Sequence, residues 1–187
     1  IREVQNYRAA MSPAVAWVKK TGLTLAAICH THKVLMQGVR GRDKAPGRIR
    51  TTQNYIAHRG DPIDKAIFIP PAPEALTAGL MALEGFMAAP IRDPIVQTAL
   101  VHAQFERLHP FLDGNGRVGR ILIPLMLFSK GLISAPTFYI SEYFEDHRDA
   151  YYDGLDAISN QNDWQGWCEF FLAAATRQAE LNALRAG

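Results

Sequence analysis

Apolar residues recur along this chain at the spacing of an α-helix. Between residues 23 and 39, positions 25, 28, 32, 35 and 39 share one face, because steps of three and four residues keep a helical face in register. The same spacing predicts further helices at 73–88, 93–108, 115–130, 141–159 and 163–184. This pattern is typical of an all-α domain.

The N-terminal region is predicted to form two helices. Residues 1–11 have a helical pattern, and Ser12 and Pro13 mark a new start that runs to Lys20. Serine is favoured at the N-cap, and proline is favoured next because the N–H it lacks would have no partner there. Pro124 lies inside a predicted helix and should kink it or leave a carbonyl unpaired. Three further N-caps are expected: Asp93, Ser141 and Asp163.

Residues 42–71 interrupt the helical pattern. Cations lie among glycines there, and the apolar residues are strand-forming types: Ile49, Tyr55, Ile56, Ile67, Phe68 and Ile69. We predict a short β-hairpin flap at about 48–69, closed by Pro70 and Pro71. Two such strands are marginal alone, so they must pack on the helices. The predicted fold is one all-α domain over residues 1–187 with a small β-hairpin flap.

The composition narrows the classes of function. With 187 residues, 48% of them hydrophobic, the chain can bury the core of one domain. A formal net charge of +2 gives no overall field for nucleic acid or an anionic membrane. Cys29 and Cys168 lack metal-site spacing and suit buried thiols in a reducing cytosol. The apolar run 121–128 is too short to cross a bilayer, so we expect a cytoplasmic protein.

Polar residues are most concentrated in the stretch 109–120, H-P-F-L-D-G-N-G-R-V-G-R. Gly114, Asn115 and Gly116 directly precede a predicted helix. Glycines allow the backbone to approach a ligand closely. Free N–H groups at a helix N-terminus favour negative charge. The stretch therefore predicts an anion site made largely from backbone.

Arg117 and Arg120 lie in the first turns of the same predicted helix. Cations there oppose the helix dipole by roughly 0.3–1 kcal/mol each, so two of them need a compensating anion. A polyphosphate would provide it, because the arginine fork matches phosphate oxygens. An isolated G-R-x-x-R more often has solvated or ion-paired arginines, but beside the glycine loop we favour phosphate.

Asp113 and His109 complete the predicted site. A carboxylate near an anion needs a cation between them, and Mg²⁺ binds carboxylates together with phosphate oxygens. The alternative is that Asp113 caps the following helix. An unperturbed histidine titrates near ~6.5, so His109 can accept a hydroxyl proton at neutral pH. A lone histidine at a helix end is more often a cap or packing residue, but the nearby Asp113 favours catalysis.

The same glycines suggest a second interpretation that the pattern excludes. Gly114, Gly116 and Gly119 match G-x-G-x-x-G, the dinucleotide fingerprint, which should follow a strand in a βαβ unit. Here a helix is predicted over 99–108, and alternating strands are not indicated. The sequence also lacks a G-x-x-x-x-G-K-[ST] loop. Neither a Rossmann fold nor a P-loop enzyme is predicted.

The stretch 109–120 resembles the signature of the Fic-domain family, H-x-F-x-[DE]-G-N-G-R-x-x-R. Every specified position is present: His109, Phe111, Asp113, Gly114, Asn115, Gly116, Arg117 and Arg120. Residues 46–56 and 68–73 resemble the flap of that family, and residues 143–152 resemble the helix after its motif. The resemblance implies a Fic-type helical bundle over nearly the whole chain.

The resemblance also implies Mg²⁺-dependent transfer of AMP from ATP to a Ser, Thr or Tyr hydroxyl of a protein, self-modification included. His109 would accept the hydroxyl proton, and Asp113 would hold Mg²⁺ on the phosphates. Residues 114–116 would form the anion hole. Arg117 and Arg120 would hold the β- and γ-phosphates.

The resemblance assigns two further regions. Ile67, Phe68 and Ile69 would form the flap edge to which a target segment adds as a strand, and an ordinary exposed hairpin is the alternative. Tyr151 and Tyr152 would border the adenine, unless both belong to the core.

Regulation and other activities stay open at this point. Related proteins are often inhibited by a helix with [ST]-x-x-x-E-[GN], whose glutamate pairs with the arginine equivalent to Arg120. Thr176 and Glu180 have the spacing without the last position, so we expect the inhibitory helix upstream of residue 1, or a separate antitoxin protein. The alternatives are UMP, phosphocholine or phosphate transfer, AMP removal, and a non-catalytic nucleotide-responsive interaction module. The sequence leaves a homo-oligomer open.

Overall fold

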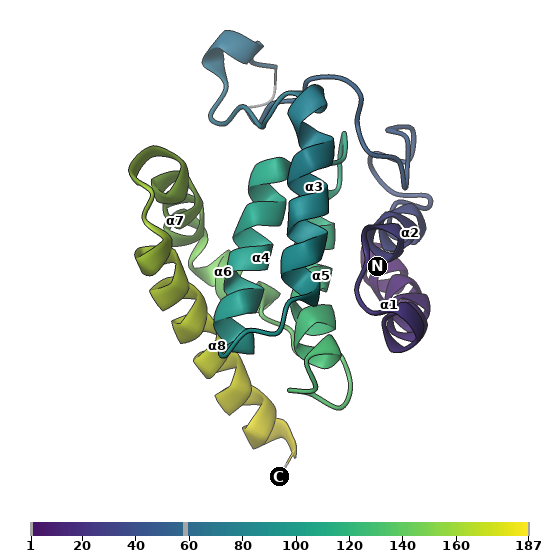
Figure 1. Ribbon diagram of the computed structural model, residues 1–187, viewed down its shortest axis with the longest axis vertical. Helices are drawn as coiled ribbons and strands as arrows, with labels where there is room; N and C mark the ends of the chain where they lie inside the picture. Colours follow the sequence, from purple (N-terminus) through teal and green to yellow (C-terminus); the bar gives the residue numbers. More distant parts are fainter. Residues whose placement is uncertain (1, 58–59, 187) are drawn as a thin grey trace.

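The computed structural model describes residues 2–57 and 60–186, and the regular structure within these ranges is helical (Figure 1). The helices are α1 (Arg2–Thr21), α2 (Leu25–Leu35), the short 3₁₀ helix η1 (Ile63–Lys65), α3 (Pro73–Ala88), α4 (Pro94–Leu108), α5 (Asn115–Ser129), α6 (Ser141–Asp146), α7 (Arg148–Gln161) and α8 (Trp164–Ala186). None of the described helices is long and apolar enough to cross a membrane. The predicted all-α class is confirmed.

The helices α4 and α5 form the centre of the bundle. A short loop, residues 109–114, joins them, so α5 packs back along α4. Figure 1 shows α1 and α2 on one side of this pair and α7 and α8 on the other. Each side has its own apolar core, and α4 and α5 contribute to both. The loop between them is therefore positioned by the whole bundle.

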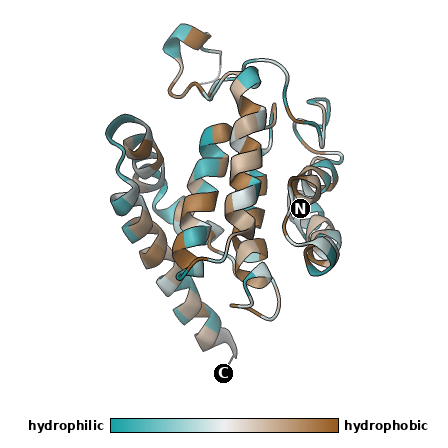
Figure 2. Ribbon diagram, in the orientation of Figure 1, coloured by the Kyte–Doolittle hydropathy of each residue, from teal (hydrophilic) through white to brown (hydrophobic). Residues whose placement is uncertain are grey.

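Helix α5 is buried around most of its circumference. Every residue from 118 to 127 is buried except Arg120, whereas Figure 2 shows many hydrophilic positions on the outer helices α7 and α8. A helix that is apolar on all sides needs neighbours on all sides, and α1, α2 and α4 pack against it. The helix continues through Pro124, which has no N–H to donate to the carbonyl of Arg120.

The N-terminal region forms one helix, which corrects the prediction of two. Pro13 lies within α1. Ala10, Ala14 and Val18 are buried at steps of four residues, so one apolar stripe packs on α2 and α5 on both sides of the proline. This continuous packing outweighs the hydrogen bond that Pro13 cannot make.

The opposite correction applies to residues 141–159, which form two helices. The break lies at His147 (φ −117°, ψ 42°) and brings the rings of Phe144 and Tyr151 together, with centroids 4.8 Å apart. Of the predicted N-caps, the carboxylates of Asp93 and Asp163 accept N–H groups of the first turns of α4 and α8. Ser141 is not a cap, because α6 begins one residue earlier than a Ser141 cap requires.

The predicted β-hairpin is wrong. Among the described residues of 48–69, one antiparallel bridge joins Ile56 and Phe68, with the Ile56 N–H 2.9 Å from the Phe68 carbonyl. Ile67 and Ile69 are 59% and 54% exposed. A longer ladder needs a buried face to fix its register, and these exposed side chains provide none. The flap is extended chain with a single bridge.

Replacing Trp167 by alanine is expected to destabilise the fold by roughly 3–5 kcal/mol, because this ring is fully buried and its N–H donates to the Ala99 carbonyl at 2.9 Å. The matched control is Trp17→Ala, which should cost about 1 kcal/mol or less because Trp17 is 37% exposed. Urea unfolding followed by circular dichroism measures both variants. Equal losses of stability in the two variants would contradict the packing of Trp167, a residue of α8, against α4.

Candidate functional site

The loop between α4 and α5 has unusual backbone geometry at both ends. His109 ends α4 in the left-handed region (φ 47°, ψ 58°), and Gly114 precedes α5 in the same region (φ 82°). A non-glycine residue rarely adopts a positive φ, so the surrounding structure must hold His109 there. The loop therefore carries backbone strain at the residue predicted to be the base.

The side chain of Asn115 closes this loop. Its Oδ1 accepts from the Phe111 N–H at 2.8 Å, and its Nδ2 donates to the Phe111 carbonyl at 2.7 Å. Asn115 is 2% exposed, so both bonds are shielded from water. The side chain holds the loop, which leaves the backbone N–H groups of Asn115 and Gly116, in the first turn of α5, for an anion.

His109 is held in one neutral tautomer. Its Nδ1 lies 3.2 Å from the carbonyl of Glu106, and a carbonyl can only accept, so Nδ1 carries the proton. Burial, and to a smaller extent the charge of the nearby Arg50, lowers the His109 pKa from 6.5 to about 4. At neutral pH, Nε2 therefore presents an unprotonated lone pair. This is the state that a general base requires.

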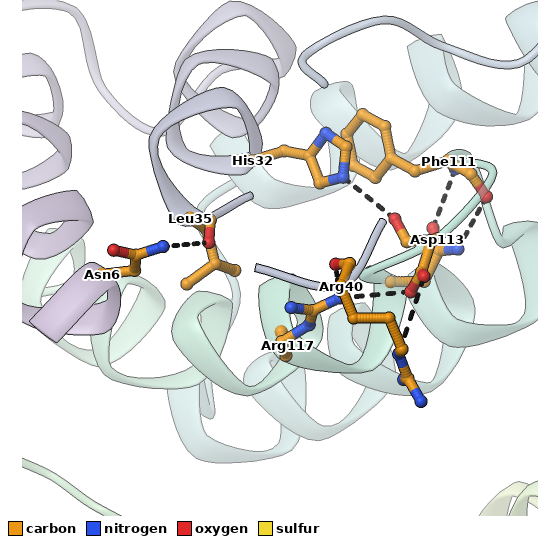
Figure 3. A network of polar contacts seen from close by, with 8 residues as sticks. Asn6, His32, Leu35, Arg40, Phe111, Asp113 and Arg117 are labelled. Atoms are coloured by element: carbon orange, nitrogen blue, oxygen red, sulfur yellow. Dashed lines mark hydrogen bonds and ion pairs between the residues drawn. The ribbon is translucent and has the colours of Figure 1, made fainter. Parts of the chain in front are cut away.

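The Asp113 carboxylate forms ion pairs with arginines and does not cap α5. Its Oδ1 lies 3.2 Å from Nη2 of Arg117, and its Oδ2 lies 3.8 Å from Nε of Arg40 (Figure 3). The N-cap of α5 is Gly114, and no side chain caps it. The backbone carbonyl of Asp113 accepts from Nε2 of His32 at 2.9 Å. The carboxylate is thus fixed from both sides of the loop.

A magnesium ion would fit this carboxylate only together with a phosphate ligand. The described residues contain no cluster of three or more His, Cys, Asp or Glu side chains that could hold a metal. Mg²⁺ commonly takes one or two carboxylates plus phosphate oxygens and waters. Asp113, with its side chain 25% exposed, is a donor of that kind. An arriving metal must displace the two arginines from its oxygens.

The two arginines of the motif have different surroundings. Arg117 contacts Asp113 and also donates to the carbonyl of Arg40 at 3.2 Å. Arg120 makes no hydrogen bond or ion pair with the part of the chain that the structure describes. Its Nη1 would lie 3.4 Å from a Cβ at Gly116, so the glycine leaves the space beside the guanidinium open. Arg120 is therefore available to an anion at the start of α5.

Sequence reasoning missed the residues that support the loop from the flap. Arg50 is 3% exposed and donates to the carbonyl of His109 at 2.9 Å, and Asn54 donates to that of Phe111 at 2.9 Å. The Arg50 bond satisfies the carbonyl of the C-cap residue of α4, where a cation is favourable, and the Asn54 bond satisfies a carbonyl of the loop. Single polar residues in an irregular segment have no periodic signal. His32 did have a periodic signal, because it occupies a core position in the helical pattern of residues 23–39.

Glu106 was also missed, and it lies buried beside α5. Its Oε1 has no hydrogen-bond partner in the described part of the chain. Burial raises the Glu106 pKa from 4.5 to about 7, and the charge of Arg120 opposes the rise. A Cβ at Gly119 would overlap the Glu106 carboxylate, so this position needs glycine.

The two predicted adenine residues have different positions. Tyr151 is 6% exposed, and its hydroxyl lies 3.0 Å from Nε2 of the buried His102, within the core. Tyr152 is 52% exposed, with the guanidinium carbon of Arg148 5.7 Å from its ring centroid. A cavity of about 280 Å³ lies between the flap, α4 and α7, and its lining residues are Phe68, Ile69, Pro71, Gln104, Arg107, Leu108 and Ser159.

Comparisons with known proteins agree with this geometry. A family model described as the Fic/DOC family matches residues 22–127. The chain is 30% identical to the protein adenylyltransferase Fic of Culex quinquefasciatus over 72% of this chain and 24% of that protein. It is 40% identical to a probable protein adenylyltransferase of Aquifex aeolicus over 31% of this chain and 18% of that protein. The chain spans about a quarter of the length of the first curated relatives.

Solved structures show the same fold. A Fic family protein from Desulfovibrio desulfuricans G20 superposes with a TM-score of 0.81 at 24% identity, covering 100% of this chain and 54% of that one. Fic-1 of Caenorhabditis elegans gives a TM-score of 0.65 at 22% identity, covering 98% and 53%. The helical fold is common to all three.

The stability difference between Glu106→Gln and the wild type should depend on pH. A carboxyl whose folded pKa is raised to about 7 stabilises the fold fully below its ordinary value of 4.5, and this contribution is lost as the pH rises through 7. The variant cannot lose it, so its stability relative to wild type should increase by roughly 2–3 kcal/mol between pH 5 and pH 8. Urea unfolding at several pH values measures the difference.

Comparing Glu106→Gln with the wild type removes the contribution of the histidines, which changes stability with pH in the opposite direction. Burial lowers the pKa values of His102 and His109 to about 4, so their neutral forms stabilise the fold above pH 6.5, and this is lost as the pH falls toward 4. That loss is common to wild type and variant. A stability difference that stays constant from pH 5 to pH 8 would mean that Glu106 does not titrate as described.

Proposed function

Because this chain belongs to the Fic/DOC family, we propose that it transfers AMP from ATP to a Ser, Thr or Tyr hydroxyl of a protein. The observation that carries the proposal is the state of His109. Its Nδ1 is committed to the Glu106 carbonyl, and its Nε2 is unprotonated at neutral pH. It sits at one end of a loop whose other end opens α5, where backbone N–H groups favour phosphate.

The proposed reaction uses this arrangement as follows. Nε2 of His109 takes the proton of the target hydroxyl as its oxygen attacks the α-phosphorus of ATP. The new O–P bond forms while the bond from the α-phosphorus to the bridging oxygen breaks, and pyrophosphate leaves with that electron pair. The amides of Asn115 and Gly116 bind the phosphate oxygens, and Arg120 holds the departing pyrophosphate.

Asp113 is the residue that would hold magnesium. Bound Mg²⁺ would supply positive charge to the phosphate oxygens. Asp113 would hold this ion in place of its arginine contacts, and His32 keeps the backbone of Asp113 in position through the bond to its carbonyl. Arg117 then lies beside the same phosphates.

The adenine of ATP and the target segment would both bind on the flap side of the site. The cavity between the flap, α4 and α7 would receive the adenine, and Leu108, directly before His109, is one of its lining residues. Ser159 lines it from α7, and Tyr152 lies two turns earlier on the same face of that helix. Ile67 and Ile69 are exposed and Phe68 between them is half-buried, and an extended target segment would pair along these three residues.

Arg120 makes no hydrogen bond or ion pair within the described chain, which also fits external control. A glutamate from an inhibitory helix, in cis or from an antitoxin protein, could pair with this guanidinium and exclude the phosphate that it would otherwise bind. The site would then be switched by one ion pair.

Isotope transfer tests the reaction. The protein is incubated with Mg²⁺ and a cell extract, and with ATP labelled at the α- or the γ-phosphate. Label from the α-position should enter protein, and His109→Ala should reduce it at least about 100-fold, because general-base catalysis contributes on this scale. The control His147→Ala should keep the activity, because His147 binds a carbonyl in α6, away from the loop. Transfer of γ-label would instead indicate kinase chemistry.

Replacing Arg120 by alanine should raise the KM for ATP about 10-fold or more with little change in the melting temperature, since the side chain makes no bond within the described chain. Steady-state kinetics and thermal unfolding measure the two effects. Arg177→Ala is the control, because this exposed arginine pairs only with Glu180 on α8 within the described residues. Parallel loss of stability and activity in Arg120→Ala would oppose a phosphate role.

A further inference from the structure

The loop after α2, residues 36–47, packs directly on the loop 109–114 between α4 and α5, which is called the motif loop below. Gly41 is buried with φ 83°, and a Cβ there would lie 2.6 Å from Oδ2 of Asp113. Real Cβ atoms do not approach so closely, so only glycine allows this contact. The two loops therefore fit together at the carboxylate that would hold the metal.

Hydrogen bonds from Asn6 and His32 fix the position of this loop at its two ends. The Nδ2 of Asn6, on α1, donates to the carbonyl of Leu35 at 3.0 Å (Figure 3). It also donates to the carbonyl of Gln37 at 2.6 Å. The Nδ1 of His32, on α2, accepts from the Gly47 N–H at 2.8 Å, while its Nε2 donates to the Asp113 carbonyl. The neutral imidazole of His32 thus connects the two loops. The backbone of residues 36–47 is therefore held in a fixed position beside Asp113.

Arg40 is the side chain that this loop presents to Asp113. Its carbonyl accepts from Nη2 of Arg117 at 3.2 Å, which fixes its backbone. Its own guanidinium lies 3.8 Å from Oδ2 of Asp113, and the side chain is 85% exposed. Such an exposed ion pair stabilises little, so the guanidinium can leave the carboxylate at small cost.

The charges at Asp113 require an additional anion when a nucleotide binds. One carboxylate faces two guanidinium groups in this structure. When the carboxylate binds a divalent cation, the guanidinium of Arg40 loses this counter-charge and remains next to a metal. The phosphates that accompany the metal provide the missing negative charge, and arginine binds phosphate oxygens with a matching fork.

We propose that Arg40 is a further phosphate-binding residue of this site, which exchanges Asp113 for the terminal phosphates of a nucleoside triphosphate. The proposal rests on the proposed nucleotide-dependent function. It adds a third arginine, from a segment outside the motif. It also gives Asp113 a second role, because this carboxylate keeps Arg40 in place before the nucleotide arrives.

The loop itself provides a matched control. Arg42 has the same side chain, lies two residues further on and is exposed. Within the described chain its recorded contact is the backbone bond to the Val39 carbonyl. Replacing either arginine by alanine removes one positive charge from the same loop. A long-range effect of charge should therefore be equal in the two variants, whereas a direct contact should be specific to Arg40.

Binding is measured by calorimetry with ATP, ADP and AMP in the presence of Mg²⁺, in a His109→Ala parent that cannot turn over. Arg40→Ala should weaken ATP binding about 10-fold, because a charge-assisted contact is worth about this factor. AMP binding should change less than about 2-fold, since AMP lacks the terminal phosphates. Arg42→Ala should match the parent for all three nucleotides, and Arg40→Lys should recover part of the loss.

Three results would overturn the proposal for Arg40. They are ATP binding by Arg40→Ala equal to that of the parent, equal losses in Arg40→Ala and Arg42→Ala, and equal losses for AMP and ATP. Thermal unfolding confirms that the variants are folded. A parent that binds none of the nucleotides would instead remove the proposed function, and the inference with it. Parent binding without an effect of Arg40→Ala removes the inference alone.

Discussion

The hydrogen bonds between the Asn115 side chain and the Phe111 backbone hold together the loop on which the site depends. Both bonds are short and buried, at 2.8 and 2.7 Å, so without them the Phe111 N–H would be buried unpaired and the Phe111 carbonyl would keep only the bond from Asn54. They close the turn that ends α4 at His109 and begins α5 after Gly114. The base and the anion-binding amides keep a fixed relation because one side chain links the segments that carry them.

The irregular segments around this loop are held by polar side chains rather than by a sheet. Arg50 and Asn54 donate to carbonyls of the loop from the flap, and His32 connects it to residues 36–47. Each of these groups satisfies backbone atoms that no helix or strand satisfies. The flap can therefore lack a β-ladder, with its edge at Ile67 exposed, and still be anchored beside His109.

Burial also sets the charge states at the site. His109 and His102 are kept neutral, and the pKa of Glu106 is raised to about 7, because burial desolvates each of these groups on α4 or at its end. Charge is instead concentrated where solvent reaches, at Asp113 and the arginines around it. The apolar bundle thus provides a neutral base, and the loop surface provides the cations that a polyphosphate needs.

The sequence determined the helical bundle, most helix positions and the motif 109–120, because helical periodicity, N-caps and glycine spacing are local properties of the chain. It could not determine whether Pro13 ends a helix, whether residues 48–69 form a ladder, or which of Tyr151 and Tyr152 is buried, since packing partners decide each of these. Only the tertiary structure placed Arg40, Arg50 and His32 around Asp113 and His109. These contacts join segments 59 to 81 residues apart in sequence, and no local pattern encodes such a distance.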